Sequence, residues 1–103
     1  MLKAGKRRWR LIHSSAQDAA TNMAIDEAIL LLHSQHKVPP TLRFYTWKPA
    51  ALTIGYFQRA HKEVDLSVVE QYGFDFVRRM TGGRAVLHEQ ELTYSLITSE
   101  QMY

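Results

Sequence analysis

The chain has 103 residues, of which 46% are hydrophobic and 22% charged, with 5 glycines and 3 prolines. This composition is typical of a folded domain and excludes a disordered segment. A chain of this length buries only about 60–65% of the surface that its unfolded form exposes. It has no cysteine, which excludes disulfides, thiolate metal ligands and a cysteine nucleophile within these residues.

The formal net charge is +3, and the basic residues are concentrated at the start of the chain. Residues 1–8 are predicted to form a basic, solvated arm, with contact to nucleic acid or anionic lipid as the alternative. No run approaches the roughly 18 apolar residues of a membrane span, and residues 1–10 lack the apolar core of a secretory signal. We therefore expect a cytoplasmic protein that does not contact a membrane.

The predicted elements begin with a short strand at residues 8–12, followed by a helix over residues 19–36. Ile25, Ile29 and Leu32 recur at the i, i+4, i+7 spacing of a buried helix face. Asp26 and Glu27 point about 100° apart around such a helix, so they do not converge as a catalytic acid pair. They are interpreted as helix surface or as packing against a loop.

Residues 41–47 and 51–57 alternate as strands do and are predicted to form a hairpin. A short helix over 65–73 is expected to be capped by Asp65 and closed by Gly73 in a left-handed conformation. Further strands are predicted at 74–80, 85–88 and 91–98. This order predicts an α+β fold with a mainly antiparallel sheet and packed helices.

The strand at 91–98 is followed by only a few residues, which leaves nothing to cover its second face. A bare sheet edge of this kind is usually paired or covered in a complete fold. We therefore expect residues 1–103 to be the N-terminal portion of a larger catalytic domain.

The stretch "RRMTGGRAVLHEQELTYS", residues 78–95, combines a Gly82-Gly83 turn with three nearby arginines. Glycines let a ligand approach the backbone, and guanidinium groups bind carboxylate or phosphate. The stretch is neither a Walker loop nor a dinucleotide fingerprint, because a strand follows the glycines where those motifs require a helix. From the residues alone, a Gly-Gly hairpin turn with surface arginines remains an equal alternative to an anion site.

Three other features have simpler interpretations than catalysis or ligand binding. His33 and His36 are interpreted as helix C-terminal groups and not as half of a metal site, so no metal is expected. His88 is interpreted as ordering the loop in preference to acting as a general base. Four aromatic residues are interpreted as core packing, with base stacking in a nucleic-acid-binding module as the alternative: Tyr45, Trp47, Tyr56 and Phe57.

The stretch at 78–95 closely resembles the signature loop of the biotin/lipoate A/B protein ligase family, in the branch of lipoate-protein ligase A and the octanoyltransferases. Upstream, "NMAIDEAILL", "RFYTWKPAALTIGYFQ" and "FDFVRRM" stand in the order that this family uses. The resemblance covers nearly all of residues 9–100. It implies an α+β core akin to that of class II synthetases, with the loop and the following strand lining a tunnel for an acyl chain.

The resemblance also implies a binding site without its reactive groups. Arg79 matches the arginine that reaches the acyl-adenylate phosphate in the ligases, and His88 matches the histidine that closes the motif. The family's nucleophilic cysteine and its lysine lie beyond the end of this chain, so no catalytic residue is expected here and residues 1–103 alone should be inactive. The expected substrate-binding residues are Arg78, Arg79, Thr81, Gly82, Gly83, Arg84, Ala85, Val86, Leu87 and His88.

The implied function is octanoyl transfer in protein lipoylation. The octanoyl group would pass from acyl carrier protein to a lysine of a lipoyl-type domain such as the glycine cleavage H protein, with no cofactor. The alternative is an ATP-dependent lipoate-protein ligase, which would use ATP and magnesium. Arg84 stands where the ligases carry a third glycine, and this difference favours a transferase. A nucleic-acid-binding module is the second alternative, but we expect no nucleic-acid partner.

Overall fold

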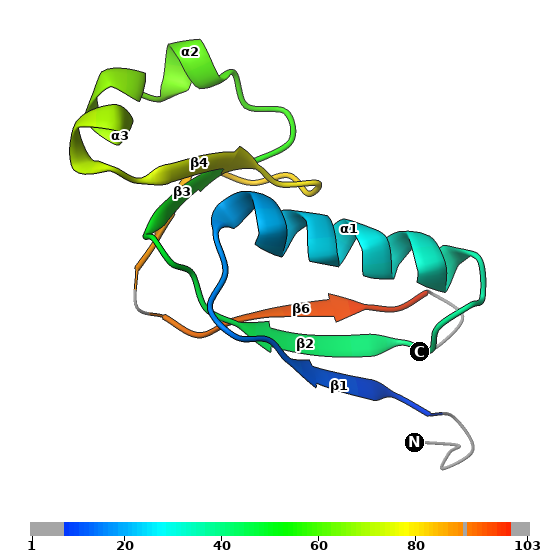
Figure 1. Cartoon of the computed structure of the whole chain (residues 1–103). Coiled ribbons are helices and arrows are strands. Elements are labelled where there is room, and N and C mark those ends of the chain that lie inside the picture. Colours follow the sequence, from blue (N-terminus) through cyan, green and yellow to red (C-terminus); the bar gives the residue numbers. More distant parts are fainter. Residues whose placement is uncertain (1–7, 90, 100–103) are drawn as a thin grey trace.

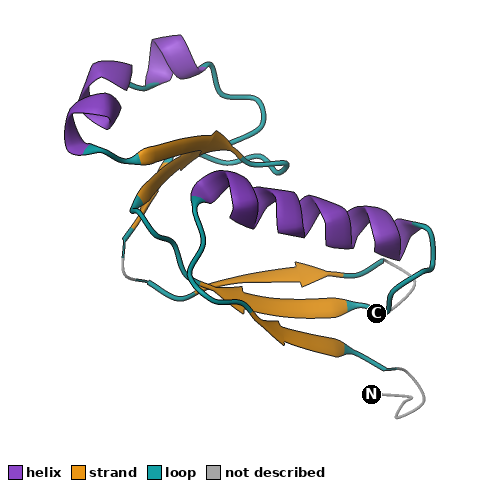
Figure 2. Cartoon of the chain, in the orientation of Figure 1, coloured by secondary structure: helices purple, strands orange, loops and turns teal. Residues whose placement is uncertain are grey.

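The computed structural model describes residues 8–89 and 91–99, and its elements confirm the α+β class (Figures 1 and 2). Most of the predicted basic arm, residues 1–7, lies outside the described residues. The strands are β1 Arg10–His13, β2 Thr41–Tyr45, β3 Ala51–Ile54, β4 Asp75–Arg78, β5 Val86–His88 and β6 Thr93–Ile97. The helices are α1 Ala19–Ser34, α2 Ala60–Glu63 and α3 Leu66–Tyr72.

The strands form two three-stranded sheets, ordered β1-β2-β6 and β4-β3-β5. In each sheet the central strand has one antiparallel neighbour and one parallel neighbour: β2 pairs with β6 and β1, and β3 pairs with β5 and β4. The predicted antiparallel pairing is therefore present in both sheets, beside a parallel pair in each. Helix α1 lies along one face of the β1-β2-β6 sheet, and α2 and α3 lie near β4 (Figure 1).

The predicted hairpin between residues 41–47 and 51–57 is wrong. Both edges of β2 are occupied by β1 and β6, and both edges of β3 are occupied by β4 and β5, so β2 and β3 cannot pair with each other. The connecting segment, which contains a cis peptide bond between Lys48 and Pro49, carries the chain from one sheet to the other. Strand β3 also ends at Ile54, and the residues after it form a loop.

Helix α1 begins where two carboxylates satisfy its first free amides. The Asp18 side chain accepts a hydrogen bond from the Thr21 amide at 2.8 Å, and Asp75 of β4 accepts from the Ala19 amide at 2.9 Å. The second contact ties the helix to the other sheet. The helix ends at Ser34, two residues before the predicted boundary of 36, and His33 donates from Nδ1 to the Val38 carbonyl at 3.0 Å.

The buried face of α1 differs from the predicted apolar stripe. Its buried residues include Asn22 and Asp26 beside Ala19 and Ile29, whereas Leu32 is 36% exposed. The interpretation of Asp26 as helix surface is wrong, because this residue is only 8% exposed. A polar helix face is buried here because β2 presents a charged partner to it.

The predicted ends of α3 are confirmed, whereas the predicted core packing of the aromatic residues is confirmed only in part. Asp65 caps α3 through the Ser67 amide at 3.1 Å, and Gly73 closes that helix with a left-handed φ of 70°, as predicted. Core packing is confirmed for Tyr45 and Trp47, which are buried. It is wrong for the other two aromatic residues, because Tyr56 is 54% and Phe57 86% exposed.

Candidate functional site

A cavity of about 430 Å³ lies between α1, β6 and the loop that follows β4. The two sheets and the helix meet at this place, so residues far apart in sequence line the same space. Most of the exposed lining is apolar, which suits a hydrocarbon ligand. The principal apolar lining residues are Met23, Leu30, Trp47, Met80, Leu96 and Ile97.

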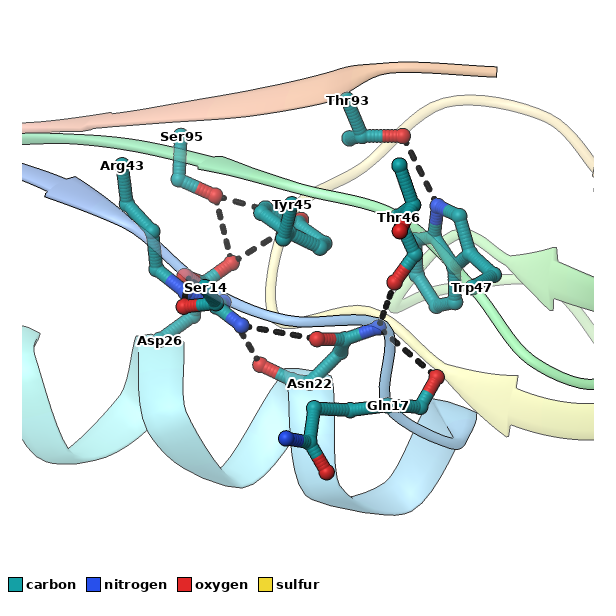
Figure 3. Close-up of polar contacts among 10 residues, drawn as sticks. All are labelled: Ser14, Gln17, Asn22, Asp26, Arg43, Tyr45, Thr46, Trp47, Thr93 and Ser95. Atoms are coloured by element: carbon teal, nitrogen blue, oxygen red, sulfur yellow. Dashed lines mark hydrogen bonds and ion pairs between the residues drawn. The ribbon is translucent and has the colours of Figure 1, made fainter. Parts of the chain in front are cut away.

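The polar lining is arranged around a buried ion pair (Figure 3). Arg43 of β2 is 0% exposed and donates from Nη1 to the Asp26 carboxylate at 2.8 Å. It also donates to the Asn22 side-chain oxygen at 2.7 Å and to the Ser14 hydroxyl at 3.0 Å. An unpaired charge at this depth would be costly, and these contacts compensate the desolvation of the guanidinium group.

Two hydroxyl groups complete the shell of Asp26 on its cavity side (Figure 3). Ser95 of β6 donates to Asp26 Oδ2 at 2.6 Å, and Tyr45 of β2 donates to the same oxygen at 3.2 Å. Burial raises the pKa of Tyr45 above its ordinary value of 10.0, and the neighbouring Asp26 carboxylate raises it further. The tyrosine is therefore a neutral donor at physiological pH, and Asp26 is an acceptor with a full set of donors.

Arg79 organises the Gly-Gly loop from within. Its guanidinium group donates to the Gly82 carbonyl at 3.1 Å, to the Arg84 carbonyl at 2.8 Å and to the Thr53 hydroxyl of β3 at 2.7 Å. Gly83 adopts a φ of 101°, a conformation that favours glycine. The loop thus wraps around the arginine that precedes it, and these guanidinium donors bind the protein's own oxygens.

Arg78 holds the neighbouring loop after β3 in the same way, by donating to its carbonyl groups. Its Nη1 donates to the carbonyls of Gly55, Tyr56 and Gln58 at 3.3, 2.8 and 2.6 Å. The two loops touch directly, because the Tyr56 amide donates to the Thr81 carbonyl at 2.8 Å. A Cβ atom on Gly55 would lie 2.9 Å from the Gly83 carbonyl carbon and closer still to its oxygen, so only glycine fits here.

His88 connects the loop to both sheets. The imidazole is 7% exposed and stacks on Trp47 with ring centroids 4.3 Å apart. Its Nε2 lies 3.0 Å from the Thr53 hydroxyl and its Nδ1 lies 2.7 Å from Glu91 Oε2. Partial burial raises the pKa of Glu91, but the hydrogen bonds from His88 and Thr93 outweigh it and hold the pKa below its ordinary value of 4.5.

The structure places some of the predicted site residues in the cavity lining and the others outside it. Arg79, Thr81 and His88 line the cavity together, whereas Arg78 braces the loop after β3. The other predicted residues, which are exposed and are not among the lining residues, are Gly82, Gly83, Arg84, Ala85, Val86 and Leu87.

The sequence reasoning missed the side of the cavity formed by α1, β2 and β6, above all Asp26 and Ser95. One feature of the sequence did indicate this side of the cavity. Asn22 and Asp26 stand at i, i+4 on one helix face, with Ile29 following at the next turn. Two polar residues in line with a buried apolar residue indicate a polar partner across the interface.

Three further observations concern the chemistry that the described residues can offer. Within residues 8–89 and 91–99, no cluster of three or more His, Asp or Glu side chains is placed to hold a metal ion. The helices in the same part of the chain are too short or too polar to span a bilayer. The chain has no cysteine. The arrangement can enclose an apolar ligand and present backbone groups and neutral donors at one end of it.

The family model of the lipoyl protein ligase A/B catalytic domain matches residues 18–102. The match covers most of the chain, and the chain belongs to this family. The resemblance found in the sequence is thereby confirmed.

Curated relatives with similar sequences include octanoyltransferases. Octanoyltransferase LipM of Brevibacillus brevis is 66% identical over 92 residues, which are 89% of this chain and 33% of that protein. Octanoyltransferase LipM of Bacillus subtilis is 55% identical over 96 residues, which are 93% of this chain and 34% of that protein. The chain thus spans about a third of the length of these curated relatives.

The solved structures that are similar to this chain include lipoate ligases. A bi-partite lipoate protein ligase from Thermoplasma acidophilum, studied with its E2 lipoyl domain, is 35% identical with a TM-score of 0.73. The likeness covers 87% of this chain and 35% of that chain. The fold is therefore shared between transferases and ligases, and the fold alone does not separate the two reactions.

Proposed function

We propose that the whole protein is an octanoyltransferase of protein lipoylation and that this chain supplies its acyl-binding cavity. The observation that carries the proposal is the identity of 66% to an octanoyltransferase across 89% of the chain. The cavity supports it, because Met23, Leu30 and Leu96 offer apolar lining to a hydrocarbon chain. The loop at 79–84 would hold the carbonyl end of that chain.

In the proposed reaction, a cysteine thiolate outside this chain attacks the carbonyl carbon of an octanoyl thioester on acyl carrier protein. The carrier's thiolate leaves, and the octanoyl group remains on the enzyme as a new thioester. A lysine amine of the acceptor then attacks that thioester, loses a proton, and releases the cysteine thiolate. The residues of this chain bind the acyl group, orient its carbonyl and exclude water.

The acceptor is proposed to be a lipoyl-type domain such as the glycine cleavage H protein. The solved relative that was studied with an E2 lipoyl domain supports an acceptor of this class. We further propose that the whole protein acts in the cytoplasm without a resident cofactor and without nucleic acid. Burial of Tyr45 and Trp47 removes two of the four aromatic residues that base stacking would require.

Arg79 bears on the choice between transferase and ligase. A ligase of this family would need the arginine to reach an adenylate phosphate, whereas two of its guanidinium nitrogens here bind Thr53, Gly82 and Arg84. An adenylate would have to compete with these contacts. A thioester carries no phosphate at that point, so the loop in its present form suits acyl transfer better.

The test uses the whole protein with octanoyl carrier protein and a lipoyl-type acceptor. We expect transfer without ATP, and we expect thiol alkylation to abolish it. A parallel reaction receives free lipoate, ATP and magnesium in place of the thioester. If acceptor modification occurs only in the ATP reaction and survives alkylation, the protein is a ligase and the proposal is wrong.

A further inference from the structure

The hydrogen bonds around His88 take their direction from the chemistry of the partner groups. An arginine side chain only donates, so Thr53 Oγ1 accepts from Arg79 Nη1 at 2.7 Å. The proton of the Thr53 hydroxyl is then available for His88 Nε2 at 3.0 Å. The Glu91 carboxylate beside Nδ1 only accepts, so Nδ1 carries a proton, and an Nε2 without a proton then accepts from Thr53.

The other side of the ring fits this tautomer. The Nδ1–H group donates to Glu91 Oε2 at 2.7 Å, and the Thr93 hydroxyl donates to the same oxygen at 2.8 Å. Thr93 in turn accepts from Trp47 Nε1 at 2.7 Å. Two chains of hydrogen bonds thus end at Glu91 Oε2. One runs from Arg79 through Thr53 and His88, and the other runs from Trp47 through Thr93.

A proton on Nε2 would change this arrangement. The Nε2–H group would face Thr53 Oγ1 as a second donor beside Arg79 Nη1, and the Thr53 proton would turn away from the ring. The charged groups around the ring are Glu91 on its Nδ1 side and Arg79 beyond Thr53, and Asp26 of α1 lines the same cavity. Trp47 of the β2–β3 connection and Thr53 of β3 carry no charge. When Nδ1 donates to Glu91, the Nε2 lone pair is therefore used by the Thr53 hydroxyl.

We propose that His88 is a positioning residue and not the general base: Glu91 fixes its Nδ1–H tautomer, and its Nε2 orients Thr53, which holds Arg79 inside the Gly-Gly loop. Glu91 and Thr53 thereby become part of the site although neither lines the cavity. The same hydrogen bonds link the loop to Trp47 of the β2–β3 connection and to Thr93 of β6 in the other sheet. A change at Glu91 is transmitted through His88 and Thr53 to the loop carbonyls of Gly82 and Arg84.

This inference rests on the proposed function in one respect, because it takes the loop to be part of an acyl-binding site. The test of the inference needs no acyl transfer. The tautomer of His88 is measured on the unmutated whole protein by ¹⁵N NMR of the imidazole nitrogens near neutral pH. We expect a protonated Nδ1 and an unprotonated Nε2. A protonated Nε2, in the neutral or the charged ring, would overturn the proposal even if transferase activity is later found.

Substitution at Thr53 tests the link to the loop. The Tyr56 amide reports the loop position, because it is held by the Thr81 carbonyl at 2.8 Å. In Thr53→Val, which lacks the hydroxyl, we expect the Tyr56 amide to exchange about 10-fold faster or more, since a charge-assisted hydrogen bond to Arg79 is lost. Thr53→Ser restores the hydroxyl and should restore slow exchange. Equal exchange in all three proteins would contradict the link.

Substitution at Glu91 tests the tautomer control, with Glu89 as its matched control. Glu91→Gln removes the charge that attracts the Nδ1 proton, so a measurable share of the Nε2–H tautomer should appear. Glu89→Gln removes an exposed carboxylate two residues away and should leave the ring in the Nδ1–H form. The same tautomer shift in both variants would mean that general surface charge controls His88, and the specific role of Glu91 would be lost.

Discussion

Arginine serves two different purposes in the two sheets of this protein. In the β1-β2-β6 sheet, Arg43 is fully buried and its partners include a carboxylate. In the β4-β3-β5 sheet, Arg78 and Arg79 stand at the end of β4 and bind mainly neutral backbone carbonyls. The first arrangement fixes the helix to its sheet, whereas the second shapes two loops beside the cavity.

The difference follows from desolvation. A buried charge that loses its partner cannot be rehydrated, so every part of the Arg43 network depends on the others. A half-exposed guanidinium group that leaves a carbonyl returns to water at a much smaller cost. The β1-β2-β6 side should therefore respond to mutation as a unit, and the loop side should lose less stability when one of its contacts is removed.

The largest expected effect is from Arg43→Met. This change leaves the Asp26 carboxylate buried and unpaired, which should lower the free energy of unfolding by about 3–5 kcal/mol. Urea denaturation followed by circular dichroism measures it. Arg59→Met is the control, because Arg59 is exposed and surface substitutions usually change stability by less than about 0.5 kcal/mol. A loss below about 1 kcal/mol in Arg43→Met would contradict the comparison.

An intermediate effect is expected from Gly55→Ala, which breaks the contact between the two loops. The new methyl group collides with the Gly83 carbonyl, and overpacking of this kind costs about 1–3 kcal/mol. Gly82→Ala is the matched control, since a Cβ there meets nothing within 4 Å. Denaturation midpoints and the exchange rate of the Tyr56 amide should separate the two variants. Equal losses would show that the loops do not pack as described.

The smallest effect concerns alkaline pH and the polar lining near Asp26. Because burial raises the folded-state pKa of Tyr45 above 10.0, the stability that its neutral form contributes is fully present below that pH and is lost as the pH rises through the folded-state pKa. In Tyr45→Phe this alkaline loss should be smaller. Unfolding free energies measured between pH ~8 and ~11 test it, with Tyr56→Phe, an exposed tyrosine, as control. Identical alkaline slopes in Tyr45→Phe and the unmutated chain would contradict the assignment.

The sequence predicted the features that depend on local chemistry. Gly73 has the left-handed φ angle that was predicted for it, and Asp65 caps its helix. For the arginines next to the Gly-Gly turn, the residues alone left an anion site and a plain surface turn as equal alternatives. Arg78 and Arg79 bind carbonyl oxygens of the chain itself, which no spacing rule reveals, because the carbonyls become available only after the loop has folded.

The features that depend on distant partners could not be predicted. Asp26 has the polarity of a surface residue, and only the pairing of α1 with β2 places Arg43 opposite it. The segments 41–47 and 51–57 have the short separation of a hairpin, yet both edges of β2 and of β3 are taken by other strands. In both cases the competing interaction lies more than ten residues away in the sequence, where periodicity carries no information.

The central claim is that the cavity beneath the Arg79 loop holds the acyl chain. The most direct test compares two neighbouring leucines of α1 in the whole protein: Leu30 lines the cavity, whereas Leu31 is 56% exposed and does not. We predict that Leu30→Phe lowers kcat/KM for an octanoyl donor about 10-fold or more relative to a butyryl donor, while Leu31→Phe leaves that ratio unchanged. An unchanged ratio in Leu30→Phe, or an equal change in both variants, would contradict the account.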